Sequence, residues 1–99
     1  MQRFFLIRRV VGRSMAPRLK PGKLVIATPL LKKLRPGQVV ILNHDGKEKI
    51  KRIERIDSPE AKHLFVIGDN LKASSDSRHF GWIKKREVVA RVLWPRLHN

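Results

Sequence analysis

Short runs of apolar, mostly β-branched residues alternate along the chain with glycine, proline and polar residues. This pattern is typical of β-strands joined by tight turns. The sequence Asp45-Gly46 between two such runs predicts a hairpin turn. We therefore expect a mainly β fold, with residues 1–99 forming one compact domain of short antiparallel strands. The six predicted strands cover residues 4–11, 23–28, 38–42, 47–56, 63–67 and 87–93.

Two segments fit this pattern less clearly. Ile50, Ile53 and Ile56 recur at every third residue, which favours an amphipathic helix over an alternating strand. The β-branched content and the preceding hairpin turn favour a strand, so periodicity alone leaves both open. Residues 30–34 have the composition of one helical turn, although the flanking prolines confine it.

Composition limits the classes of protein that the chain can represent. Its 99 residues, 41% of them hydrophobic, are enough for a single core. It has no cysteine, which excludes disulfides and thiolate metal sites. The formal net charge of +15 favours contact with polyanions such as nucleic acid, anionic lipid or acidic polypeptide. The alternative is a basic surface that only keeps the protein in solution.

The N-terminal region contains no segment that could span a membrane. The apolar run at residues 4–7 ends at Arg8 and Arg9. A spanning helix needs about 20 apolar residues, and the apolar core of a secretory signal about 7–15. We therefore expect a cytoplasmic protein, or one that lies against a membrane surface.

Ser14 lies in the first of three stretches that suggest chemistry. Gly12 and Pro17 bend the chain around it, and a serine on such a turn can present its hydroxyl and its backbone N–H to a substrate carbonyl. Taken alone, the signal is weak, because a serine between glycine and proline usually only hydrogen-bonds its own turn.

Lys51 lies in the second stretch. A lysine acts as a base only when neutral, and its reference pKa is about 10.4. Burial beside Ile50 and Ile53, and the charge of Arg52, would lower that pKa. The alternative is a solvated basic strand.

The third stretch is the polar loop at residues 68–83, which follows a predicted strand. It carries two clusters of small polar residues and can close on itself through side-chain to backbone hydrogen bonds. The alternative is an ordinary surface loop. The histidines show no metal-ligand spacing, and we expect them to be ordinary surface or half-buried residues: His44, His63, His79 and His98.

Together the three stretches resemble the conserved boxes of signal peptidase I and its relatives, in the same order along the chain. The resemblance covers residues 10–93, and Gln38 stands where the family usually has aspartate. The matching stretches are Gly12-x-Ser14-Met15-x-Pro17-x-Leu19, Pro36-Gly37-Gln38-Val39-Val40, Lys51-Arg52-Ile53 and Gly68-Asp69-Asn70-x3-Ser74-x-Asp76-Ser77-Arg78-x2-Gly81.

The resemblance implies a serine–lysine protease. Ser14, followed by Met15 in the nucleophile box, would attack the scissile carbonyl, and its backbone N–H would supply half of the oxyanion hole. Neutral Lys51 would accept the serine proton and later protonate the leaving amine. Ser74 would orient the lysine. The family fold is mainly antiparallel β with the lysine on a strand, which decides the assignment around Ile50.

The remaining matching residues would support the site. Asp76 and Arg78 would pair and hold the last box in shape, and Asp69 and Asn70 would hold the loop beside the active site. Gly12 stands where some relatives carry a serine whose hydroxyl adds an oxyanion-hole donor, so this donor is missing here.

The chain also departs from typical signal peptidases. Only 13 residues precede Ser14 and only 16 separate Lys51 from Gly68, so we expect neither a membrane anchor nor the usual second β domain. It is similar to compact relatives that trim short N-terminal extensions, such as the nickel superoxide dismutase maturation proteases. The expected partner is a precursor protein with a cleavable N-terminal segment, with peripheral contact to an anionic membrane as a further option. We expect no cofactor, no metal and no nucleic acid.

Two other interpretations fit part of the sequence. The self-cleaving domain of LexA-type repressors shares the chemistry and the fold, but it cuts at Ala-Gly or Cys-Gly, and neither dipeptide occurs here. A non-catalytic basic module that binds nucleic acid would fit the charge, and its bases would stack on aromatic side chains. The basic residues are spread rather than clustered, and this interpretation leaves the last box unexplained. The candidate stacking residues are Phe4, Phe5, Phe80, Trp82 and Trp94.

Overall fold

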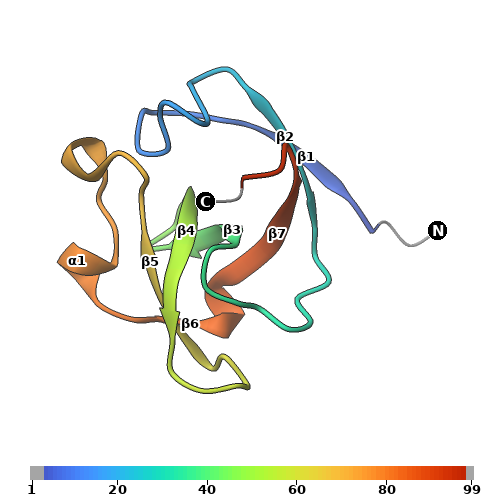
Figure 1. The fold of residues 1–99 in the computed structure, drawn as a ribbon, viewed down its shortest axis with the longest axis vertical. Coiled ribbons are helices and arrows are strands. Elements are labelled where there is room, and N and C mark those ends of the chain that lie inside the picture. The colour runs from blue at the N-terminus through green and yellow to red at the C-terminus, as the bar shows by residue number, and fades with distance from the viewer. Residues whose placement is uncertain (1–3, 98–99) are drawn as a thin grey trace.

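A computed structural model describes residues 4–97, which form a seven-stranded antiparallel sheet in the order β1-β2-β7-β3-β4-β5-β6 (Figure 1). A short helix, α1 (Ser77–Phe80), lies beside β5, and single 3-10 turns cover Leu71–Ala73 and Lys85–Glu87. The strands are β1 (Leu6–Arg9), β2 (Leu24–Thr28), β3 (Val39–His44), β4 (Lys47–Ile56), β5 (His63–Ile67), β6 (Ile83–Lys84) and β7 (Val88–Trp94).

The mainly β, antiparallel fold predicted from the sequence is confirmed, and all six predicted strands are present. β4 and β5 have the predicted bounds, and the other strands differ only at their ends. The pattern missed β6, whose two residues pair with the start of β5 and are too short to show alternation. It also missed α1. Residues 30–34 form no helix; the chain turns there at Lys32 and Lys33.

The hairpin between β3 and β4 forms at the predicted dipeptide. Asp45 and Gly46 have φ values of 51° and 75°, the left-handed conformation that a two-residue hairpin turn of this type requires at both positions. The turn fixes the register, so that Val40 lies directly opposite Lys51 across the two strands. Directly opposite residues point to the same face of a sheet.

The isoleucines of β4 recur every third residue because the strand contains an irregularity, not because it is a helix. Ile50 packs on one face of the sheet and Ile53 on the other, as alternation requires. The register then shifts between Ile53 and Arg55, which returns Ile56 to the face of Ile53. An extra residue of this kind breaks the period of two and produces a spacing of three.

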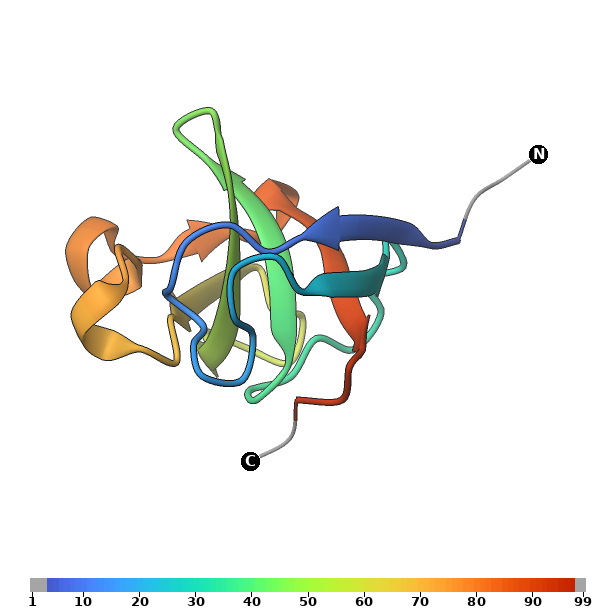
Figure 2. The ribbon, with the colours of Figure 1, turned by 90° about the horizontal axis from the view of Figure 1, so that it is seen from above.

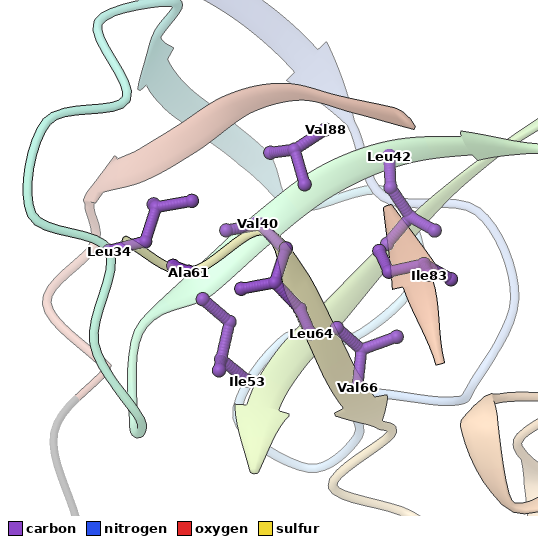
Figure 3. Close-up of a cluster of buried hydrophobic side chains, with 9 residues drawn as sticks. All are labelled: Leu34, Val40, Leu42, Ile53, Ala61, Leu64, Val66, Ile83 and Val88. Atoms are coloured by element: carbon purple, nitrogen blue, oxygen red, sulfur yellow. The ribbon is translucent and has the colours of Figure 1, made fainter. Parts of the chain in front are cut away.

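The sheet buries apolar side chains on both faces. One cluster, drawn in Figure 3, comes from β3 to β7 and two loop residues. The second lies between β1, β2, β3, β7 and the segment that connects β1 to β2, which crosses that face of the sheet (Figure 2). Val39, Val40, Ile41 and Leu42 of β3 are all buried, since this central strand serves both clusters.

No helix among residues 4–97 combines the length and the apolar character needed to cross a bilayer. His98 lies outside the described residues.

Candidate active site

Ser14 lies on a tight turn in the segment between β1 and β2. The turn is closed by the N–H of Ala16 donating to the carbonyl of Arg13 (3.1 Å), and the N–H of Leu19 donates to the carbonyl of Met15 (3.0 Å). Met15 and Leu19 are buried in the core, which fixes the turn against the sheet, while Ser14 itself is half-buried. Met15 thus acts as the apolar anchor of the predicted nucleophile turn.

The loop after β5 holds this turn from the other side. The backbone N–H of Asn70 donates to the carbonyl of Ser14 (2.8 Å), and its side-chain amide donates to the carbonyl of Arg13 (3.1 Å). The N–H of Asp69 lies 3.4 Å from the sulfur of Met15. The structure therefore brings together the first and last of the predicted boxes, which are more than fifty residues apart in the chain.

Lys51 is buried on β4, with 4% of its surface exposed. It lies on the sheet face of Val40 and Ile53, and its Nζ donates to the Ser74 hydroxyl at 3.0 Å. Among the described residues this is its only hydrogen bond, and none joins it to the Ser14 hydroxyl. Burial, and next the positive charge of Lys49, lower the pKa of Lys51 from 10.5 to about 8, although Asp76 opposes them.

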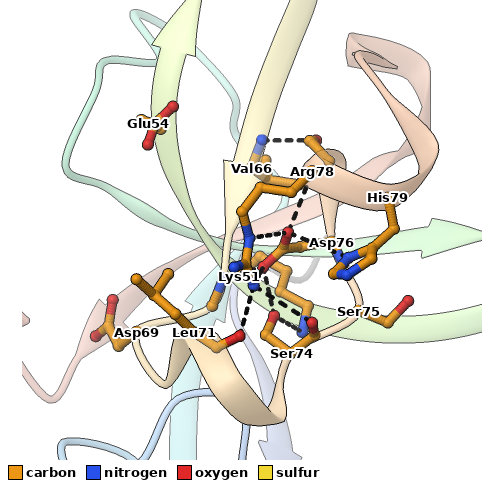
Figure 4. Close-up of polar contacts among 12 residues, drawn as sticks. Lys51, Glu54, Val66, Asp69, Leu71, Ser74, Ser75, Asp76, Arg78 and His79 are labelled. Atoms are coloured by element: carbon orange, nitrogen blue, oxygen red, sulfur yellow. Dashed lines mark hydrogen bonds and ion pairs between the residues drawn. The ribbon is translucent and has the colours of Figure 1, made fainter.

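Asp76 receives the hydrogen bonds of this network (Figure 4). It is completely buried, and it accepts from the Ser74 hydroxyl (2.6 Å) and from the N–H of Gly68 (2.9 Å). The Arg78 side chain donates to both carboxylate oxygens, at 2.9 and 3.1 Å. Burial would raise the pKa of Asp76, but the hydrogen bonds from Arg78, Ser74 and Gly68 hold it well below its usual range.

The same aspartate begins α1. Its side chain also accepts from the N–H of Arg78 (3.1 Å), and its own N–H donates to the ring of His79 (3.3 Å), which completes a capping box. Two backbone groups at the start of the helix are satisfied in this way. The helix therefore exists at a place where four residues alone would not sustain it.

Gly68 allows the two halves of the site to meet. A Cβ added there would lie 2.3 Å from the Ser74 hydroxyl oxygen and 2.6 Å from the Ser14 carbonyl oxygen. Both residues therefore border the same position, and Ser74 is in turn bonded to Lys51. Only a residue without a side chain fits there.

Arg52 is placed differently from the expectation. Neighbouring strand residues point to opposite faces, and Arg52 turns away from Lys51 to form a two-pronged ion pair with Asp69, at 2.8 Å for each contact. The positive charges that lower the pKa of Lys51 come from Lys49 and Arg78 instead. Lys49 is two residues from Lys51 and shares its face, a signal that the sequence contained and that its interpretation missed.

A hollow of about 570 Å³ lies beside the Ser14 turn. It is lined by Ala16, Pro17, Asp69, Asn70, Leu71 and Lys72. A polypeptide segment passing Ser14 would have room there.

The described histidines have structural partners, in line with the expectation for them. His44 contacts Glu87 (3.0 Å) and stacks on Phe80, and His63 contacts Asp57 (2.8 Å). Within residues 4–97, no group of three or more His, Cys, Asp or Glu side chains is arranged to hold a metal ion.

Comparison with known proteins agrees with the last of the predicted boxes, residues 68–81. Residues 57–96 match the family described as "Signal peptidase, peptidase S26". Signal peptidase I of Bacillus caldolyticus is 49% identical over 35 residues, which is 32% of this chain and 19% of that protein. The matched part therefore spans about a fifth of the relative's length. These matches confirm the predicted resemblance for the C-terminal part of the chain, which is similar to the peptidase S26 signal peptidases and distantly homologous to signal peptidase I over about a third of the chain.

Proposed function

We propose that this protein is a serine endopeptidase in which Ser14 is the nucleophile and Lys51 the general base, and that it removes a short N-terminal segment from a precursor protein. The observation that carries the proposal is the burial of Lys51, which lowers its pKa to about 8 while a hydroxyl of the loop beside Ser14 orients it. The family itself consists of serine peptidases and implies precursor proteins as substrates.

The lowered pKa makes the base available near neutral pH. A lysine with the reference pKa of about 10.4 is neutral in well under one molecule in a thousand at pH 7, whereas a pKa of about 8 leaves roughly a tenth neutral. A base whose pKa lies near the working pH is also the most effective in proton transfer. No other described lysine is buried.

In the proposed reaction, the Ser14 hydroxyl oxygen bonds to the scissile carbonyl carbon while its proton passes to neutral Lys51. The tetrahedral intermediate collapses, the C–N bond breaks, and the leaving amine takes the proton from Lys51. Water then attacks the acyl-enzyme, with Lys51 accepting its proton and returning it to Ser14. Every proton taken up in one step is delivered in the next.

The negative oxygen of that intermediate needs a donor in place before the reaction. The backbone N–H of Ser14 has no acceptor among the described residues, so it is free for this role. Gly12 has no side chain to add a second donor. Ser74, Asp76 and Arg78 are assigned as positioning residues for Lys51.

Two further residues are assigned to support. Asp69 and Asn70 would hold the Ser14 turn at its distance from the lysine, through the contacts described above. The identity of the precursor, the peripheral contact with an anionic membrane and the place of the protein in the cell stay predictions from the sequence.

The test is cleavage of candidate precursors by wild type and Ser14→Ala, followed by intact-mass spectrometry, with Ser75→Ala as the matched control. Ser75 is exposed and its side chain has no hydrogen bond in the described structure. We expect Ser75→Ala to cleave normally and Ser14→Ala to be inactive while it melts at the wild-type temperature. Cleavage by a folded Ser14→Ala protein would end the serine-protease proposal, and a loss of mass from the enzyme itself would favour the self-cleaving alternative.

A further inference from the structure

A second and larger cleft, of about 790 Å³, lies where β7 ends and β3 begins. None of the residues assigned to the candidate active site lines this cleft, and no step of the proposed protease reaction takes place in it. Its walls are formed by the segments 35–39, 91–93 and 95–97.

The charge of this cleft has one sign. Arg35, Arg91 and Arg96 line it, and no acidic residue among residues 4–97 does. Among the described residues, none of these three guanidinium groups has a hydrogen-bond acceptor or an ion-pair partner. Arg8, Arg52 and Arg78, in contrast, are each paired with a carboxylate. Three unpaired cations around one hollow repel one another, and an anion between them would remove that repulsion.

Arg91 gives the most specific indication. Its Nε is buried and has no hydrogen-bond partner, a state found for no other buried side-chain nitrogen or oxygen in the described part of the chain. The buried Nε has no partner even from solvent, so the half-exposed Arg91 cation is held at a cost that an anion bound to the accessible part of its guanidinium would offset. Arg91 lies on β7 between β2 and β3, opposite Thr28 and Val40, so neighbouring strands on both sides hold its backbone in place.

The rest of the cleft lining indicates the chemistry of the organic part of the ligand. The cleft has an apolar side, and no aromatic residue of the described range lines it for stacking on a base. The apolar lining residues are Pro36, Val39, Val92, Leu93 and Pro95. The volume lies in the range of small-molecule sites, about 300–1,000 Å³. Arginine forks match the paired oxygens of both carboxylate and phosphate, and the doubly charged phosphate of an ester meets three positive charges more fully than one carboxylate does.

We propose that this cleft binds a phosphate ester, with Arg35, Arg91 and Arg96 around the phosphate and the organic part against the apolar wall. Two sources share this chemistry: a free phosphorylated small molecule and the headgroup of an anionic phospholipid.

The cleft is also connected to the candidate site. Nη1 of Arg52 donates to the carbonyls of Gly37 and Leu97 in the cleft wall, both at 2.6 Å, while its other nitrogens hold Asp69. A ligand that orders the cleft wall therefore acts on a residue that also holds the loop beside Ser14. Binding itself requires no catalysis, so this proposal can fail or succeed independently of the protease.

The experiment is titration calorimetry with glycerol 3-phosphate, alongside sedimentation with phosphatidylcholine vesicles that contain phosphatidic acid. Arg91→Met removes the charge but keeps much of the side chain. Arg96→Met removes a second charge of the cleft at an exposed position, so the proposal stays testable if Arg91→Met does not fold. Arg86→Met is the matched control, because it removes the same charge from an exposed position outside the cleft.

We expect the affinity for the ester, the vesicles or both to fall at least tenfold in Arg91→Met and Arg96→Met, and less than twofold in Arg86→Met. Binding of the free ester alone would assign the small molecule as the source, and binding of the vesicles alone the lipid headgroup. Absence of binding to both, an equal loss in Arg86→Met, or equally tight binding of succinate would overturn the proposal.

Discussion

At the scale of single residues, Lys51 differs from the other lysines of the chain in its surroundings. It lies between apolar neighbours on a central strand, with like charges near it and one hydroxyl at its amine. Water would stabilise the ammonium form of an exposed lysine, and burial takes that stabilisation away. The proposed chemistry depends on this difference.

If Lys51 is the base, kcat/KM should rise about tenfold per pH unit below pH 8 and level off above it, because only the neutral amine accepts a proton. Lys51→Arg should be inactive across the range, since a guanidinium does not lose its proton in a protein. Steady-state rates from pH 6 to 9.5 measure both. A flat profile, or a Lys51→Arg protein with near-normal rates, would require another base.

The same pKa has a consequence for stability that needs no substrate. Below pH 8 Lys51 is charged in the folded and the unfolded state, and the folded state bears the cost of the buried charge. Between about pH 8 and 10.5 only the unfolded state holds the proton, so stability should rise with pH by about 3 kcal/mol. Lys51→Met should lack this rise. The difference between wild type and Lys51→Met in urea unfolding at pH 7.5 and 10 isolates the contribution of Lys51, because the two proteins share every other ionisable group.

At Gly68, the space between Ser14 and Ser74 is too small for any side chain. Gly68→Ala should cost about 1–3 kcal/mol of stability, the usual cost of overpacking, and it should reduce cleavage by pushing Ser14 and Ser74 apart. Gly22→Ala is the control, because a Cβ added there meets no atom within 4 Å and the variant carries only the strain of its φ of 91°. Thermal melting and cleavage rates compare the two. Equal effects would show that the close approach at Gly68 is unimportant.

At the scale of elements, α1 and the loop before it depend on one carboxylate. Asp76 caps the helix, pairs with Arg78 and accepts from the loop at Gly68 and Ser74. These contacts join β5, the loop and the helix to the strand that carries Lys51. The support of the base is therefore the same set of bonds that folds this part of the chain.

Asp76→Asn should lower stability by about 1–3 kcal/mol, because a neutral amide leaves Arg78 and two other donors poorly matched. The folded-state pKa of Asp76 is depressed, so its contribution is complete above the unfolded pKa of about 4 and is lost as pH falls below it. The difference between wild type and Asp76→Asn should therefore shrink below pH 4. Melting temperatures from pH 2.5 to 7 test this, with Asp45→Asn, an exposed hairpin residue, as the control. A difference that is constant with pH would contradict it.

At the scale of the whole molecule, the net charge of +15 acts on association. A positive field draws acidic polypeptides and anionic lipid to the protein, and salt screens it beyond about 8 Å at physiological ionic strength. The local contacts of the candidate site are shorter than that and buried, so screening should affect them little.

Added salt should therefore raise KM for an acidic precursor, and weaken binding to anionic vesicles, while kcat stays nearly constant. Lys32→Gln with Lys33→Gln, at an exposed turn, should act in the same direction but more weakly. Steady-state kinetics over a salt series measure KM and kcat, and sedimentation with anionic vesicles, with neutral vesicles as the control, measures membrane binding. If salt changes neither quantity, the basic surface serves only to keep the protein in solution.

The sequence by itself determined the strand content, the hairpin at Asp45-Gly46 and the family resemblance. These depend on local properties: the run of β-branched residues, the left-handed turn that Asp-Gly favours, and the order of short motifs. β6 and α1 were missed because neither has a pattern of its own. β6 forms by pairing with β5, and α1 forms because Asp76, held by distant contacts, caps it.

Only the tertiary structure decided how the site is assembled. The sequence could place Lys51 in an apolar stretch, but its burial depends on which strands lie beside β4 and on the face that a two-residue turn assigns to it. The partner of Arg52 was likewise hidden, since strand alternation directs it away from Lys51 and toward Asp69. The cleft with its three unpaired arginines joins segments far apart in the chain, whose proximity is a property of strand order alone.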